Sequence, residues 1–358
     1  MIFLKKAFIV SGVFISSIIG AGFASGNEIL FYFSKFGKFG LFGILLTVIL
    51  FCVLQYLILS QSNAMGTTNF DEYLNNIMGK YPAVFISVCA YTFMIFIFSA
   101  MLSGFGEMIA MLYGIDKLWP VLFMLACCYF ILIKGYNFFV KSESLLSVLI
   151  VASIIFAGFY ILLFRESSVA AVKLPQSWFT SSVSYVSYNI LTLSSVLCLM
   201  GKETNKKSAL FSSAITFSVL FILMIIFWYI LCIYSGMISL GAIPMLTICY
   251  RQSNWLGIIY SCAIFLAMLT TAITNCYVLS QKLNIYIKKP LCDLLIIVSA
   301  FFLSALDFTF IVDKLYRFVG VVSVFLIFAV IRKNFFVNFE NFKKNIEKLR
   351  KQEKNKDI

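Results

Sequence analysis

The sequence predicts an all-α membrane protein of about ten transmembrane helices, the first of which is interrupted near its middle. Of the 358 residues, 62% are hydrophobic and only 12% are charged, whereas a soluble domain carries about 25% charged residues. Apolar stretches of about 20 residues, the length that a spanning helix needs, recur along the whole chain. The first of them contains three glycines, Gly20, Gly22 and Gly26. This composition fits a chain whose main solvent is lipid.

Ten apolar segments are long enough to span a bilayer, and the five prolines fall near the ends of these segments or between them. Pro82, Pro120 and Pro290 fall near expected helix starts, where a missing N–H costs little, and Pro175 and Pro244 fall in connections. No proline interrupts the centre of an expected helix. The expected segments are 5–33, 39–60, 82–113, 118–136, 143–164, 177–200, 208–236, 254–281, 290–311 and 314–331.

The distribution of lysine and arginine predicts that both chain termini are cytoplasmic, because positive residues favour the inner side of a membrane. The basic segment 334–358 is expected to be a cytoplasmic tail, following a single transmembrane domain over 1–333. The connection at 165–177 divides the segments five and five. Because five is odd, two related halves, about 1–165 and 174–333, would be inverted in the membrane, a plan typical of secondary transporters.

The composition also argues against several classes of protein. The chain has ten cysteines but no CxxC pair and no histidine, so we expect neither a disulfide framework nor a zinc site. Without histidine, the commonest proton carrier near neutral pH is missing. No phosphate-binding P-loop and no catalytic constellation with convincing spacing is found. We therefore expect neither an ATP-driven pump nor an enzyme, and no organic cofactor.

The glycine-rich run from Gly20 to Gly26 predicts unwound backbone at mid-membrane. Each glycine weakens a helix by roughly 1 kcal/mol relative to alanine, and unwound backbone survives in a bilayer only within protein or beside a watery cavity. Its free carbonyls can bind a cation. Close helix packing is the alternative, because Gly22 and Gly26 form a GxxxG motif. Packing would not require Asn27 and Glu28 directly after the glycines, so we favour a binding site.

Polar residues inside the apolar segments supply further candidates. Intramembrane carboxylates are functional candidates by default, and Glu28 is the strongest; it could recognise an amine, carry a proton or hold the half-helix in place. Glu107 and Asp307 are expected near the membrane interfaces. The hydroxyl-rich segment 177–200 favours a cavity wall, with interhelical hydrogen bonds as the alternative. The candidate substrate-binding residues are Gly20, Ala21, Gly22, Phe23, Ser25, Gly26, Glu28, Tyr91, Ser184, Tyr188 and Asn189.

The run Ile19-Gly20-Ala21-Gly22-Phe23-Ala24-Ser25-Gly26-Asn27-Glu28-Ile29 resembles the signature of the YkvI-like family of bacterial membrane proteins. That family is related to the amino acid–polyamine–organocation superfamily. The resemblance covers 1–333 and implies a five-plus-five inverted-repeat fold with discontinuous helices one and six, in the plasma membrane of a bacterium. The segment 177–200 departs from this pattern, because no glycine lies between Trp178 and Met200.

In sodium symporters of this fold, a sodium ion lies between the first and eighth helices. The eighth helix contributes the pattern Ala-x-x-(Thr/Ser)-(Thr/Ser), which Ala267-Met268-Leu269-Thr270-Thr271 matches. Hydrogen bonding of both threonines to their own helix is the alternative. The segment 143–164 contains no lysine or arginine, which argues against a lysine-based proton mechanism. The sodium ligands implied by the resemblance are Ser16, Ile19, Ala267, Thr270 and Thr271.

The function implied by the resemblance is secondary active transport of a small organic solute, such as an amino acid or amine. Transport would proceed by alternating access and would be coupled to sodium. The alternative is a receptor or sensor that binds a ligand on the same fold without net transport. The expected partners are the solute and the lipid bilayer, and nucleic acid is not expected.

Overall fold

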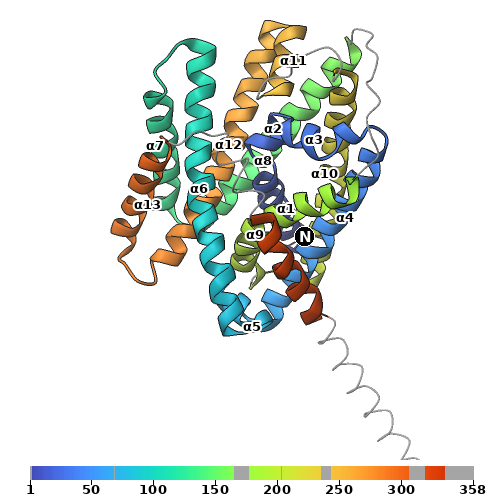
Figure 1. The fold of residues 1–358 in the computed structure, drawn as a ribbon. Helices are drawn as coiled ribbons and strands as arrows, with labels where there is room; N and C mark the ends of the chain where they lie inside the picture. The colour runs from blue at the N-terminus through green and yellow to red at the C-terminus, as the bar shows by residue number, and fades with distance from the viewer. Residues whose placement is uncertain are drawn as a thin grey trace, which may run out of the picture.

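The computed structural model of the chain is built from helices (Figure 1) and describes residues 2–67, 69–164, 177–202, 204–234, 243–305 and 319–334. The tail beyond residue 334, the connection 165–176 and Asp307 lie outside the described residues. The helices are α1 (Ile2–Ile18), α2 (Ala21–Ala24), α3 (Asn27–Tyr32), the 3₁₀ turn η1 (Ser34–Phe36), α4 (Phe39–Met65), α5 (Phe70–Met78), α6 (Lys80–Tyr113), α7 (Leu118–Lys134), α8 (Tyr136–Leu163), α9 (Trp178–Gly201), α10 (Lys206–Tyr234), α11 (Pro244–Gln252), α12 (Asn254–Leu283), α13 (Lys289–Leu303) and a last helix at 319–334.

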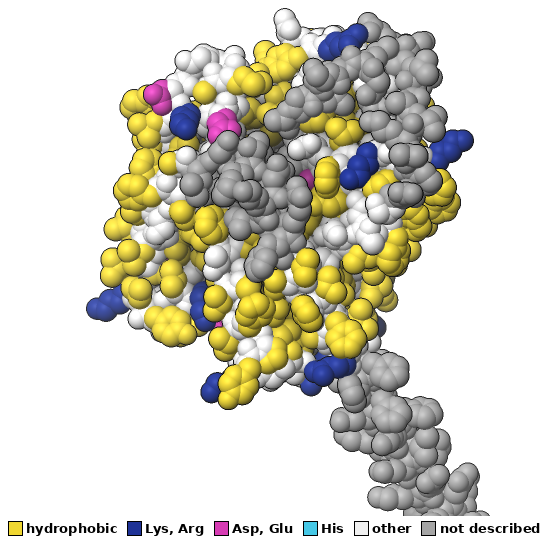
Figure 2. Space-filling model, in the orientation of Figure 1, with side chains coloured by type: hydrophobic (Ala, Val, Ile, Leu, Met, Phe, Trp, Pro, Cys, Tyr) yellow, Lys and Arg dark blue, Asp and Glu magenta, His cyan; other side chains and the backbone are white. Residues whose placement is uncertain are grey.

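The chain is a multi-pass membrane protein. Within the described ranges, six helices are long and apolar enough to cross a membrane, namely α4, α6, α8, α9, α10 and α12. Hydrophobic side chains cover the visible flank of the molecule (Figure 2), and large ones such as Phe8, Phe85 and Phe130 are more than half exposed. Such exposure fits contact with lipid and would be a liability in water. The full count of ten spans stays a prediction.

Helices α9 and α12 form the interior of the bundle. In their most apolar windows, 78% of α9 and 72% of α12 is buried inside the protein, compared with 33% of α8. The helix α9 packs against α4, while α12 packs against α6 and α8. These two most enclosed helices are rich in hydroxyl and amide side chains, which lipid could not satisfy.

The predicted interruption of the first spanning helix is confirmed. The helix α1 ends at Ile18, and the chain continues through two short helices, α2 and α3. Gly20 is extended, with φ −85° and ψ −168°, and Gly26 adopts the left-handed region at φ +81°. Glycine occupies that region without the steric cost that other residues meet. The two glycines thus end one helical piece and redirect the next.

The expected interruption of the sixth spanning helix is wrong, because α9 is continuous from Trp178 to Gly201. Several of its polar side chains donate hydrogen bonds to carbonyls of their own helix, although Ser181 Oγ donates to the Tyr32 carbonyl at 3.0 Å. Ser182 Oγ donates to the Trp178 carbonyl at 2.8 Å and Asn189 Nδ2 donates to the Tyr185 carbonyl at 2.9 Å. With no glycine or proline before Gly201, nothing in this segment weakens the backbone enough to break it.

Candidate functional site

The carbonyl groups freed by the break in the first helix are bound by other parts of the protein. The Tyr260 hydroxyl of α12 donates to the Ala24 carbonyl at 2.6 Å, and the Met245 amide of α11 donates to the Ser25 carbonyl at 2.8 Å. Ser25 Oγ in turn donates to the Gly22 carbonyl at 3.0 Å. Because a buried carbonyl without a partner is costly, these bonds allow unwound backbone to persist deep in the bundle.

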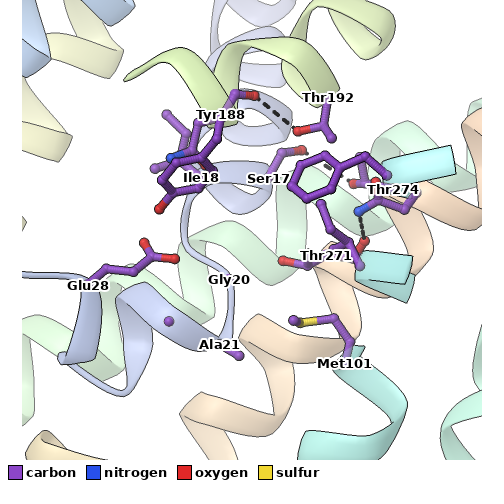
Figure 3. A pocket seen from close by; sticks show the side chains of 15 residues that line it. Ser17, Ile18, Gly20, Ala21, Glu28, Met101, Tyr188, Thr192, Thr271 and Thr274 are labelled. Atoms are coloured by element: carbon purple, nitrogen blue, oxygen red, sulfur yellow. Dashed lines mark hydrogen bonds between the residues drawn. The ribbon is translucent and has the colours of Figure 1, made fainter. Parts of the chain in front are cut away.

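A small cavity of about 30 Å³ lies directly at the break, enough room for one or two water molecules. Glu28 and Tyr188 face each other on one side of this cavity, and Thr271 and Thr274 lie on the other (Figure 3). The cavity is lined by Ser17, Ile18, Gly20, Ala21, Gly22, Glu28, Phe93, Ile97, Met101, Tyr188, Asn189, Thr192, Thr271, Thr274 and Asn275. Residues from α1, the break, α3, α6, α9 and α12 therefore meet at one point.

Six of the eleven residues predicted from the sequence to bind substrate line this cavity: Gly20, Ala21, Gly22, Glu28, Tyr188 and Asn189. Three others on the broken helix do not line it. Phe23 is fully buried and packs against Phe227 with ring centres 5.4 Å apart. Ser25 lines a separate outer cavity, and Gly26 supplies the left-handed turn. These three residues shape the broken helix rather than the cavity wall.

Tyr91 and Ser184 also lie elsewhere. Phe93, Ile97 and Met101 are spaced four residues apart and place one face of α6 at the cavity, whereas Tyr91, two residues from Phe93, points away from that face. It lines an inner cavity instead. Ser184 lines a groove near η1; the ring of Tyr32, 5.9 Å from that of Tyr188, belongs to the same groove.

Glu28 supplies the carboxyl group of the central cavity. The hydroxyls of Tyr185 and Tyr188 interact with it, and its Oε2 atom is buried without a hydrogen bond of its own. The rings of Tyr32, Tyr185 and Tyr188 cluster beside it with centres 5.2–5.9 Å apart. Carboxylates and aromatic faces both attract cations, so this wall of the cavity is suited to a positively charged group.

The candidate sodium ligands of α1 and α12 lie together in the structure. Thr270 Oγ1 is 3.3 Å from the Ser16 carbonyl and 3.0 Å from the Ala267 carbonyl, and Thr271 Oγ1 is 3.1 Å from the latter. Ile19 is fully buried in the stretch between α1 and α2. Both threonines therefore bond back to their own helix here, yet their oxygens stand beside the first helix where it unwinds.

Two buried carboxylates escaped the sequence analysis. Glu143 of α8 is fully buried and accepts a hydrogen bond of 2.6 Å from Ser16 Oγ. Asp293 of α13 is 2% exposed and accepts one of 2.5 Å from Ser280 Oγ. The available signal was an acidic residue at the start of an apolar segment, a position that is usually interfacial. Only the packing of α8 and α13 reveals that these carboxylates are enclosed.

Two larger cavities lie along α6 and α12 on either side of the central one, and we name them outer and inner after the predicted orientation of the chain. The outer cavity, of about 420 Å³, lies among α6, α11 and α12 and includes Ala21 and Glu107. The inner cavity, of about 310 Å³, includes Asp71 of α5, Ser195 of α9 and Lys282 of α12. Ala21 lines both the outer and the central cavities.

An ion pair joins the elements that surround the inner cavity. Lys282 Nζ of α12 lies 2.5 Å from Asp71 Oδ2 of α5, and the Ser87 hydroxyl donates to the same carboxylate. The Lys282 ammonium also lies 5.3 Å from the ring centre of Tyr91, within range of a cation–π interaction. We call the group of Asp71, Ser87, Tyr91 and Lys282 the inner latch.

These features define a membrane protein with the LeuT-like fold of secondary transporters. The chain superposes on a Na⁺-coupled sialic acid symporter, substrate-bound and outward-open, with TM-score 0.66 and 14% identity over 88% of this chain and 76% of the other. It also superposes on MHP1, a nucleobase-cation-symport-1 family transporter, in a closed conformation with bromovinylhydantoin bound. The TM-score is 0.64 and the identity 13%, over 88% of this chain and 74% of the other. It superposes on MhsT in complex with L-phenylalanine with TM-score 0.60 and 13% identity, over 90% of this chain and 87% of the other.

The chain is a distant homologue of two Bacillus subtilis proteins. It is 24% identical to the uncharacterized membrane protein YkvI over 326 residues, which cover 90% of this chain and 94% of YkvI. It is also 24% identical to the uncharacterized protein YyaD over 329 residues, which cover 88% of this chain and 94% of YyaD. A comparison with protein-family models finds no match.

Proposed function

We propose that this protein is a secondary active transporter that moves a small organic solute by alternating access, with sodium as the coupling ion. The observation that carries the proposal is the break in the first helix, which faces Glu28 on one side and the α12 threonines on the other. The ten spans would be α1 to α3 taken together, α4, α6, α7, α8, α9, α10, α12, α13 and 319–334. They would form two inverted halves in the plasma membrane of a bacterium, with both termini cytoplasmic.

The proposed solute carries an amino group, as an amino acid or an amine does. Glu28 supplies a negative charge in an enclosed place, and the three tyrosine rings beside it favour a cation. The ligands of the structural neighbours are chemically diverse, so the choice rests on this chain's own cavity. Its volume of about 30 Å³ fits a closed state that must widen to admit a solute.

The proposed sodium site combines carbonyl oxygens of Ser16, Ile19 and Ala267 with the hydroxyls of Thr270 and Thr271. Hard monovalent cations prefer such oxygen ligands. The fit is supported by the short distances from Thr270 Oγ1 to two of these carbonyls, 3.3 Å and 3.0 Å. Rotation of the two hydroxyls away from their helix carbonyls would direct their lone pairs to a cation.

Replacement of both threonines, Thr270→Ala with Thr271→Ala, is expected to abolish stabilisation by sodium. The wild-type protein should melt several degrees higher in sodium chloride than in choline chloride, because a ligand that binds only the folded state raises its stability. The double variant should melt at the same temperature in both salts. The matched control is Thr204→Ala, which removes a buried threonine whose Oγ1 donates to the Met200 carbonyl near the end of α9 at 2.7 Å.

Transport itself is tested in proteoliposomes. Amino acids and amines that raise the melting temperature in sodium should give electrogenic currents on a solid-supported membrane, and the currents should vanish without sodium. Solute binding without any flux would contradict transport and would indicate a receptor on the same fold. Currents that do not depend on sodium would contradict sodium coupling but would still support transport.

Breaking the inner latch with Asp71→Asn is expected to favour the state that is open to the cytoplasm. The pair is partly buried, with both side chains 24% exposed, so its loss should shift the equilibrium about fivefold, or ~1 kcal/mol. Amide hydrogen exchange should rise in α5 and at the cytoplasmic end of α12. Asp116→Asn, in the opposite connection between α6 and α7, is the control; equal exchange in all three proteins would show that the latch does not hold this side closed.

A further inference from the structure

Glu143 is a buried carboxylate without a compensating charge. It is fully buried near the start of α8, and its Oε2 atom accepts a hydrogen bond from Ser16 Oγ. Thr274 of α12 also interacts with the carboxylate, while its Oε1 atom makes no hydrogen bond of normal geometry. Within the described part of the chain, no lysine or arginine forms an ion pair with it. An ionised carboxylate in such a place is costly unless a cation is bound beside it. The group therefore needs either a proton of its own or a bound cation.

Ser16 connects Glu143 to the proposed sodium site. Its hydroxyl donates to the carboxylate at 2.6 Å, while its carbonyl lies 3.3 Å from Thr270 Oγ1. The helices α1 and α8 approach closely one turn away, where a Cβ on Gly12 would lie only 2.9 Å from Ser144 Oγ. This close approach allows a side chain of α8 to reach the unwound end of α1. Three helices thus present oxygen atoms around one residue.

We propose that Glu143 is an anionic ligand of the sodium site, so that the cation is held by a full negative charge as well as by neutral oxygens. This inference rests on the proposed sodium coupling. Carboxylate oxygens are preferred ligands of hard cations, and the unpartnered Oε1 atom provides a free ligand. The cation would in return neutralise the buried carboxylate. Anchoring of α1 through the Ser16 hydrogen bond is the competing explanation for Glu143.

The substitution Glu143→Gln separates these explanations, because glutamine keeps the size of the side chain and can still accept the Ser16 hydrogen bond. Purified full-length protein would be titrated with sodium at constant ionic strength, with choline as the replacement cation and melting temperature as the readout. We expect the sodium concentration at half-saturation to rise at least tenfold, which corresponds to about 1.4 kcal/mol. Without sodium the variant should be at least as stable as the wild type. Glu107→Gln, at the outer cavity, should titrate like the wild type.

If Glu143→Gln responds to sodium as the wild type does, the proposal is overturned. If the variant with Thr270→Ala and Thr271→Ala has then lost the response, the neutral ligands alone form the sodium site. If the wild-type protein itself does not respond to sodium, the coupling and this inference fail together. Infrared difference spectroscopy of the wild type provides a test that needs no variant. Sodium should shift a carboxylate stretching band, and a spectrum without such a shift would overturn the role of Glu143.

Discussion

Glu28→Gln is expected to weaken binding of an amine-bearing solute at least a hundredfold. Glu28 supplies the carboxyl group of the central cavity, and its Oε2 atom is buried without a hydrogen bond of its own. A buried charge-assisted bond contributes about 2–5 kcal/mol when one partner is truncated, and a hundredfold loss corresponds to about 2.7 kcal/mol. The measurement is a calorimetric titration with the solutes that stabilise the wild-type protein in sodium.

The matched control for this experiment is Glu107→Gln. Glu107 lines the outer cavity, but it is exposed, and its carboxylate accepts a hydrogen bond of 3.0 Å from Ser103 Oγ. Its replacement should change solute affinity less than threefold. Equal affinities for Glu28→Gln and the wild type would show that Glu28 only holds the half-helix in place. A solute without an amino group should bind both proteins alike.

Gly22→Ala is expected to weaken solute binding at least tenfold without unfolding the protein. A Cβ at this position would lie 2.3 Å from Glu28 Oε1 and 2.7 Å from its Cδ, so the carboxylate must leave its place over the glycine. The backbone of Gly22 is helical, and alanine is favoured over glycine in a helix by about 1 kcal/mol. The flexible glutamate side chain can move at small cost. We therefore expect at least a tenfold loss of affinity and a melting temperature close to that of the wild type.

Gly320→Ala is the appropriate comparison, because among the described residues a Cβ there would meet only the Ser184 carbonyl, at 3.8 Å. It should bind solute as the wild type does. Combining Gly22→Ala with Glu28→Gln provides a second check. If the glycine acts through the carboxylate, the double variant should bind no more weakly than Glu28→Gln alone. Additive losses would indicate that Gly22 contacts the solute directly.

The first helix shows how far local sequence can predict a site. Three glycines followed by a carboxylate predict unwound backbone beside a polar group, and Gly20, Gly22 and Glu28 do line the central cavity. For α9 the break was implied only by the family resemblance, and the segment has no glycine between Trp178 and Met200 that would weaken the helix. Hydroxyl groups can be satisfied by their own helix, as Ser182 and Asn189 are, so they do not by themselves predict where a helix ends.

The sequence by itself determined the class of this protein and the position of the interruption at Gly20. Hydropathy and glycine content act locally: lipid forces apolar segments into helices, and glycine weakens them wherever it stands. Only the tertiary structure decided which side chains share the cavity. In the structure Tyr91 lies in the inner latch, away from the central cavity, and Glu143 accepts a hydrogen bond from Ser16, which is 127 residues away in the sequence. Such pairings depend on how each helix is rotated and packed, and no local pattern records that rotation.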